Sequence, residues 1–114
     1  MRRSVEAVLL RCFVGESDSF GGRPLHEAIV LEARALGIAG ATVLRGALGY
    51  GRSSRLHTAK ILRLSDDLPL VIEIVDEATR VEALLDAIEP MLDGGLVTLE
   101  TVRVLRHGAE PPPG

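Results

Sequence analysis

The sequence predicts one α+β domain with the ferredoxin-like βαββαβ arrangement, in which two helices cover one face of a four-stranded antiparallel sheet. Segments with the apolar period of strands and of helices follow in the order strand, helix, strand, strand, helix, strand. The chain has 114 residues, of which 46% are hydrophobic, so it can bury the core of one domain. Right-handed crossovers then place both helices on the same face of the sheet.

The first half of this pattern is a strand followed by a helix. Residues 5–14 read VEAVLLRCFV and are apolar on both faces, which predicts a central strand. The polar stretch GESDSFGG follows as an expected loop. Pro24 stands where a helix can begin, and Gly37 is expected to end that helix in a left-handed conformation. The apolar stripe between them consists of Leu25, Ala28, Ile29, Ala33 and Leu36.

The middle of the chain is predicted to hold two strands separated by a long loop. The strands are expected at residues 41–48 and 68–75, where apolar and β-branched residues suit a half-buried surface. The loop, residues 49–67, is long for a hairpin connection, and such loops are often functional. Within it, LHTAKILRL can be a hairpin arm or a short helix, and its periodicity does not decide between them.

The last part of the domain is predicted to be a helix followed by a strand. Asp76 is a good candidate for the helix N-cap, and Pro90 is expected to kink or end the helix early. Asp93–Gly95 forms a turn, and residues 96–105 form the final strand. The helical stripe consists of Val81, Leu84, Leu85, Ile88 and Leu92. The domain then spans residues 1–107, and the proline-rich residues 108–114 are expected to be a disordered tail.

The sheet face away from the helices needs a cover of its own. The first strand carries apolar residues on both sides, and two helices can shield only one of them. Another copy of the chain is the simplest cover for the second face, so we expect a homo-oligomer. The two apolar sets of this strand are Val5, Ala7, Leu9 and Phe13 on one side and Val8, Leu10, Cys12 and Val14 on the other.

Charge and cysteine content exclude several classes of function. The net charge of −3, with both signs mixed along the chain, argues against general nucleic-acid binding. No apolar run is long enough to span a membrane, and Glu6 and Arg11 interrupt the N-terminal apolar stretch, which argues against a signal peptide. Cys12 is the single cysteine, so no disulfide can form within the chain, as is typical of the cytoplasm.

Two long stretches resemble a known protein family. They read FVGESDSFGGRPLHEAIVLEARALGIAGATVLRGALGYG and SSRLHTAKILRLSDDLPLVIEIVDE, and the likeness covers residues 8–105. They closely resemble the bacterial and archaeal family called domain of unknown function 190, which is similar in fold to the PII signalling proteins. PII proteins are trimers that bind adenine nucleotides in clefts between subunits. They use a long mobile loop after the second strand to grip transporters or enzymes.

The likeness to PII proteins implies a set of ligand-binding residues. It is carried by GIAGATV at residues 37–43, GYGR at residues 49–52 and HT at residues 57–58. The residues implied to face the base and sugar are Gly40, Ala41 and Thr42. Those implied to come from the neighbouring subunit are Gly49, Tyr50, Gly51 and Arg52. The pair implied to bind phosphate after the last strand is Arg103 and Arg106.

The residues of the long loop permit two interpretations. Its potential cations are Arg52, Arg55, His57 and Lys60. They can form a phosphate or carboxylate site together with backbone N–H groups exposed by the neighbouring glycines, or they can simply be solvated charges. Gly46, Gly49 and Gly51 can equally serve a sharp exit from the sheet.

The sequence departs from the PII pattern in two places. The gap from Thr42 to Gly49 is one residue longer, which suggests a bulge or a different register. The glycine- and lysine-containing loop that holds the nucleotide phosphates in PII proteins is replaced by the short DGG turn, which has no lysine.

The leading hypothesis is therefore a homotrimeric PII-like regulatory protein that binds a small anion, most plausibly an adenine nucleotide, and contacts a transporter or enzyme through residues 49–67. The alternative is a ligand-free trimeric scaffold whose loop docks a partner protein. We expect no enzyme, because no Ser-His-Asp order or paired-carboxylate motif is present. We expect no cofactor and no metal, because His57 has no second ligand at suitable spacing and His26 and His107 are distant in sequence.

Overall fold

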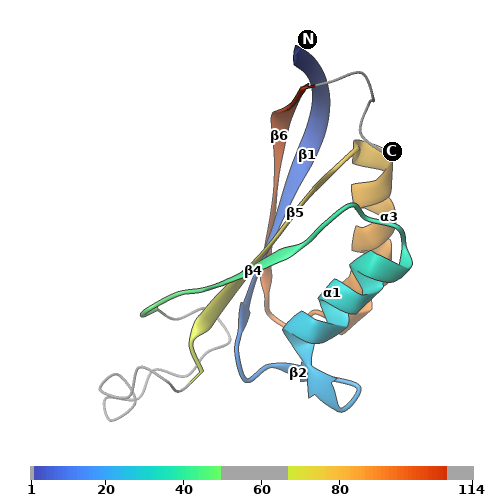
Figure 1. Ribbon diagram of the computed structural model, residues 1–114. Helices are drawn as coiled ribbons and strands as arrows, with labels where there is room; N and C mark the ends of the chain where they lie inside the picture. Colours follow the sequence, from blue (N-terminus) through green and yellow to red (C-terminus); the bar gives the residue numbers. More distant parts are fainter. Residues whose placement is uncertain (1, 50–66, 108–114) are drawn as a thin grey trace.

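The computed structural model describes residues 2–49 and 67–107, which form a sheet covered on one face by two helices (Figure 1). The helices are α1 (Leu25–Ala35) and α3 (Ala78–Ile88). The predicted tail at residues 108–114 and most of the predicted loop at residues 49–67, including LHTAKILRL, lie outside the described residues.

The main sheet has four antiparallel strands in the order β4-β5-β1-β6. This order and the position of the two helices confirm the predicted ferredoxin-like α+β fold. The strand β1 is central and pairs with both β5 and β6. The strands are β1 (Arg2–Gly15), β4 (Thr42–Arg45), β5 (Pro69–Asp76) and β6 (Leu96–His107).

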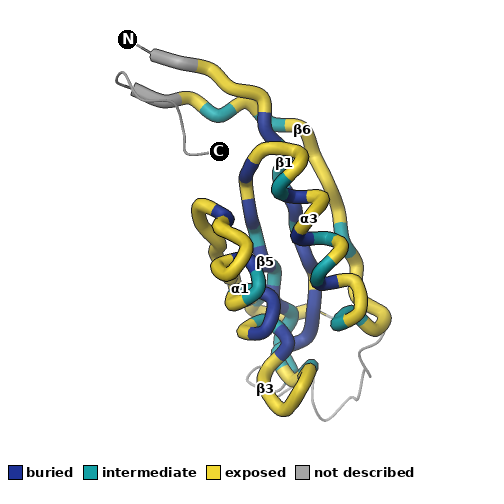
Figure 2. The backbone as a smooth tube through the Cα atoms, turned by 90° about the vertical axis from the view of Figure 1, so that its right-hand side faces the viewer, coloured by how far each residue is buried: buried dark blue, intermediate teal, exposed yellow. Residues whose placement is uncertain are grey.

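The core lies between the helices and the even-numbered positions of β1 and β5. Leu10, Cys12 and Val14 of β1 stand opposite Ile74, Ile72 and Leu70 of β5, and all six are buried. Figure 2 shows this buried layer where the two strands meet the helices. The helices contribute Leu25, Ala28, Ile29, Ala33, Val81, Leu84 and Ile88.

Both ends of α1 and the C-terminal end of α3 follow the predicted signals. Gly37 has a φ of +78°, as expected for a left-handed helix end, and its N–H donates to the carbonyl of Arg34 at 3.1 Å. Pro24 is the N-cap of α1, one residue before the first helical position. Helix α3 ends at Ile88 and continues as the 3₁₀ turn Glu89–Met91, which contains Pro90. Proline has no N–H to donate, so the α-helix ends early, as predicted.

The predicted loop after β1 contains a small hairpin instead. Its strands are β2 (Ser19–Phe20) and β3 (Arg23–Pro24), joined by Gly21 and Gly22 with φ values of +61° and +81°. A two-residue hairpin turn of this kind needs positive φ at both central positions, which glycine adopts without strain. The Gly-Gly pair was the sequence signal for this hairpin.

The strand β4 is shorter than the predicted residues 41–48. Its last ladder pair joins Arg45 to Leu70, after which the N–H of Gly46 donates to the carbonyl of Pro69 at 2.8 Å. Pro69 has no N–H with which to return a bond. The pairing therefore stops at the first residue of β5.

The prediction that Asp76 caps α3 is wrong, because Asp76 is the last residue of β5 and Glu77 is the N-cap. The Asp76 side chain is buried and accepts from two backbone N–H groups. Its Oδ2 accepts from Ala39 at 3.2 Å, and its Oδ1 accepts from Glu77 at 2.7 Å. Asp76 therefore ties the chain that follows α1 to the end of β5, which a cap would not do.

Replacing Asp76 by alanine should lower the free energy of unfolding by about 1.5–3 kcal/mol, because amide hydrogen bonds to a charged acceptor are lost. The same change at Asp86, which is exposed on α3, is the matched control and should have little effect. Urea unfolding measures both variants, and hydrogen exchange at the Ala39 amide should accelerate only in the first. Equal losses of unfolding free energy in the two variants would show that the hydrogen bonds of Asp76 do not stabilise the fold.

Burial of the Cys12 thiol predicts a pH dependence of stability. Burial raises the pKa of Cys12 to about 11, against an ordinary value of 9.0. The unfolded thiol therefore loses its proton at a lower pH than the folded one. The free energy of unfolding is therefore unaffected by this group below pH 9 and falls as the pH rises to 11, by up to about 2–3 kcal/mol. Unfolding curves from pH 8 to 11 should fall more steeply for the wild type than for Cys12→Ala, and parallel curves would refute this.

Candidate functional site

The structure describes part of the predicted ligand site. Gly40, Ala41, Thr42, Gly49 and Arg103 fall within the described residues, as does the backbone of Arg106, which pairs with Arg3. The predicted ligand residues that lie outside the described residues are Tyr50, Gly51, Arg52, Arg55, His57 and Lys60.

The residues implied to face the base and sugar, here called the base-side segment, lie at one edge of the sheet. Gly40, Ala41 and Thr42 are exposed and lead into β4, which pairs on one side only, with β5. An edge strand presents backbone N–H and C=O groups to whatever binds beside it. A side chain added at Gly40 would meet no atom within 4 Å, so this position borders open space. The bond from Ala39 to Asp76 holds the segment in place.

The glycines at the exit from β4 pack closely on proline. A Cβ at Gly46 would lie 2.8 Å from Cγ of Pro69, and one at Gly49 would lie 3.2 Å from the same atom. This contact favours the interpretation in which the two glycines allow a sharp exit from the sheet. Gly49 is therefore explained by the fold without a ligand.

Arg103 lies on the opposite edge of the sheet from this segment. It is an exposed residue of β6, and its Nε donates to Oγ of Ser4 at 3.1 Å. The strands β5 and β1 separate β6 from β4. Thr42 and Arg103 therefore do not meet within one chain, and a site that used both would need two copies.

The uncovered face of the sheet carries an ion-pair network that the sequence analysis missed. Arg11 of β1 donates from Nε to Oε2 of Glu73 at 2.9 Å and from Nη1 to Oε1 of Glu100 at 2.9 Å. Thr42 stands opposite Glu73 in the β4–β5 pairing, so the network adjoins the base-side segment. A single arginine within an apolar strand was the signal that could have pointed to it.

The charge of Arg11 is stabilised by its two partners. The hydrogen bond with Glu73 makes the largest contribution and raises the pKa of Arg11 above its ordinary value, against the opposing effect of partial burial. The charges of Glu73 and Glu100 add to this effect, as does the bond with Glu100. Arg11 thus stays a cation, and the group of three carries one more negative than positive charge.

The connection from α3 to β6 offers no cation. After the 3₁₀ turn, the chain passes through Leu92 to Gly95, and the N–H of Leu92 donates to the carbonyl of Glu89 at 3.1 Å. Gly94 has a φ of +81°, which suits a tight turn into the strand. The segment has no lysine or arginine with which to hold a phosphate.

The carboxylates near the start of the hairpin bind protein groups. Asp18 accepts from the N–H of Gly15 at 2.9 Å, Asp67 accepts from the N–H of Ser17 at 3.1 Å, and Glu16 pairs with Arg45. Within residues 2–49 and 67–107, no three His, Cys, Asp or Glu side chains form a group that could hold a metal ion. No helix in the same ranges is long and apolar enough to cross a membrane.

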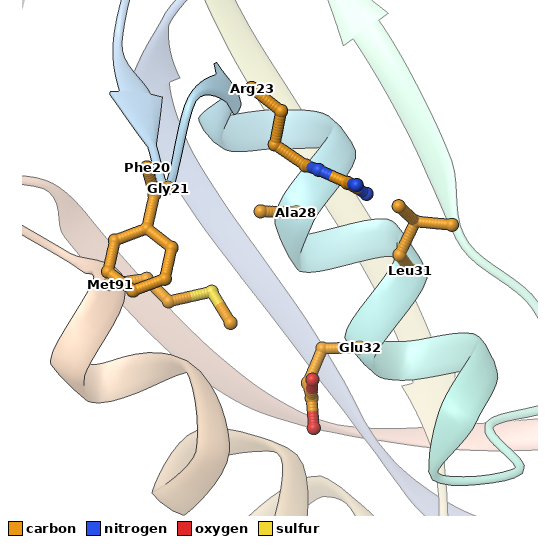
Figure 3. Close-up of a pocket in the computed structure, with 7 residues that line it drawn as sticks. All are labelled: Phe20, Gly21, Arg23, Ala28, Leu31, Glu32 and Met91. Carbon is orange, nitrogen blue, oxygen red and sulfur yellow. The ribbon is translucent and has the colours of Figure 1, made fainter.

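The helical side of the molecule has a shallow hollow of about 260 Å³ between the hairpin, α1 and the 3₁₀ turn (Figure 3). Phe20 and Met91 form one side of it, while Leu31 and Arg23 form the other. It is wide open and contains none of the predicted ligand residues. The predicted site and this hollow are therefore separate features.

Comparison with known proteins agrees with this architecture. Residues 7–104 match the family DUF190, described as "Uncharacterized ACR, COG1993". The UPF0166 protein of Aquifex aeolicus (strain VF5) is 38% identical over 103 residues, covering 90% of this chain and 97% of the relative. The UPF0166 protein MJ1524 of Methanocaldococcus jannaschii is 31% identical over 103 residues, covering 90% and 94%.

Among solved structures, the chain is similar to CPII of Thiomonas intermedia K12, a nitrogen regulatory PII-like protein bound to ADP, AMP and bicarbonate. The TM-score is 0.67 at 17% identity, and the alignment covers 90% of this chain and 91% of CPII. At this identity the likeness concerns the fold. The chain therefore belongs to the DUF190 family and has a PII-like, ferredoxin-like fold.

Proposed function

We propose that this protein is a PII-like signalling protein that binds an adenine nucleotide, or another small anion, in clefts between the subunits of a homotrimer. The observation that carries the proposal is the position of the two candidate binding groups. Gly40–Thr42 and Arg103 lie on opposite edges of one sheet, as expected of residues that meet only between copies. The nucleotides bound to CPII, ADP and AMP, suggest the ligand class.

Residues 49–67 are the proposed output of the protein. They connect two neighbouring strands by a length far above that of a hairpin turn. Arg52, Arg55, His57 and Lys60 would meet the anion, so its binding would bias the position of the loop. A transporter or an enzyme is the proposed partner, and the lone reduced cysteine is consistent with a place in the cytoplasm. The role is binding rather than catalysis.

A ligand-free scaffold is the second candidate. The observation that favours it is the turn at Leu92–Gly95, which has no cation where a phosphate would need one. In that case the trimer would serve only to present three copies of the loop to a partner protein. Ligand binding distinguishes the two candidates.

The homotrimer is expected to have a mass three times the 12.2 kDa of the chain in light scattering at micromolar concentration. The physical reason is the uncovered sheet face, whose apolar residues Phe13, Leu44 and Leu96 are exposed in the single chain. A measured mass of one chain would overturn the trimer.

Gly40→Val should abolish nucleotide binding without disturbing the fold. The added side chain enters open space beside β4, so it costs the protein little, but it occupies the volume proposed for the ligand. Calorimetric titration with ADP and with AMP measures the effect, and Ala83→Val, exposed on α3, is the matched control. Unchanged affinity in Gly40→Val would place the ligand elsewhere.

The double variant Arg52→Ala/Arg55→Ala should keep the fold and the trimer, because charges in a loop of the kind predicted for residues 49–67 contribute little to stability. Each lost charge-assisted bond should weaken nucleotide binding by about 1.5–3 kcal/mol. The same titrations test this, with Arg34→Ala on α1 as the control. Absence of binding by the wild type to ADP, AMP and bicarbonate would favour the scaffold.

A further inference from the structure

The centre of the uncovered sheet face holds an isolated group of charges. Helices α1 and α3 both lie on the other side of the sheet (Figure 1), so no helix or strand of residues 2–49 and 67–107 covers this face. Arg11 of the central strand bridges Glu73 on β5 and Glu100 on β6. These are the only charged side chains on this face within the part of the chain whose side chains are described.

Apolar residues flank the network along the strands. Toward one end of the face, Phe13 stands between Val71 and Leu96. Toward the other end, Leu9 stands beside Val75, followed by pairs that face each other across β1 and β6. Those pairs are Ala7 with Val102 and Val5 with Val104. The face is thus a charged row between two apolar surfaces.

In the proposed homotrimer this face packs against a second copy of the chain. We propose that the Glu73–Arg11–Glu100 network sets the alignment of the copies, so that the assembly closes at a single size. This inference rests on the proposed homotrimer and assigns a role to residues within its interface. The network would act as an alignment key, and the apolar residues would supply most of the binding free energy.

The charges of this face favour an identical copy as the occupant. The guanidinium of Arg11 has five N–H donors, and its two bonds use only Nε and Nη1. The Glu100 side chain is 64% exposed and can accept further bonds. The same face therefore presents a donor and an acceptor beside apolar surface, so the donor of one copy can meet the acceptor of the next copy in a ring.

Apolar contacts alone would fix the alignment poorly. A strand that slips by two residues keeps the same side chains on the same face, so apolar rows can meet again after such a shift. The charged row does not tolerate such a shift, because it would then face apolar residues of the other copy, and charges buried against apolar residues are strongly destabilising. A repeated head-to-tail contact closes into a ring only at the correct angle and otherwise grows open chains. One fixed alignment is therefore what a closed trimer needs.

The excess negative charge of the network leads to a second expectation about the affinity between subunits. Each network has two carboxylates and one guanidinium, so every copy brings one uncompensated negative charge into the interface. Removing Arg11 increases that excess, whereas neutralising Glu100 removes it. The two changes should act in opposite directions on the affinity between subunits.

Sedimentation velocity over a range of concentrations tests the proposal on four full-length variants. Arg11→Met should raise the dissociation constant of the assembly by about tenfold or more, because two carboxylates are left unpaired. Glu100→Gln should leave that constant unchanged or lower it. Arg11→Met/Glu73→Met/Glu100→Met should still associate, but into several sizes. Arg34→Met, on the exposed side of α1, is the matched control and should behave as the wild type.

Circular dichroism shows whether each variant folds, and the triple variant keeps the test valid if Arg11→Met unfolds, since it leaves no unpaired charge. A triple variant that still forms a single trimer, at whatever affinity, would overturn the alignment role while leaving the trimer intact. A monomeric wild type would overturn the trimer itself. The two failures are thus distinguishable.

Discussion

The pairing of β1 with both β5 and β6 is the constraint on which the rest of the structure depends. Because side chains alternate along a strand, this register places Leu10 and Cys12 under the helices and Arg11 on the opposite face. A slip of one residue would bury the arginine in the core and expose the leucine to water. The apolar core and the charged network are therefore consequences of the same alignment.

The order of the strands connects this fold to its proposed use. With β4 at one edge and β6 at the other, the candidate binding groups of a single chain lie on opposite sides of the sheet. Under the proposed function, assembly and ligand binding would depend on each other, because the proposed cleft would form only between copies. Such a ligand would bridge two subunits and would stabilise the assembled state over the separated one.

Local signals located the main elements correctly, and two of the three errors arose where a distant residue intervened. Asp76 has the chemistry of an N-cap, but its carboxylate bonds to Ala39, which is brought beside it by the β4–β5 pairing. The strand β4 has the composition to run further, but it stops where Pro69 cannot donate. The hairpin at Gly21 and Gly22 was a local feature that was overlooked, because polar residues around it suggested a loop.

The sequence by itself determined the type and order of the main elements, because apolar periods of two and of 3.6 residues are local properties, as are the helix ends at Gly37 and Pro90. It also located Gly40–Thr42 at the start of the strand that follows the first helix, whereas the place of that strand at the edge of the sheet came from the structure. Only the tertiary structure decided which side chains meet across the sheet. Arg11 lies 62 residues from Glu73 and 89 from Glu100 in sequence, and no local pattern specifies such a contact, which arises only when three strands take up one register.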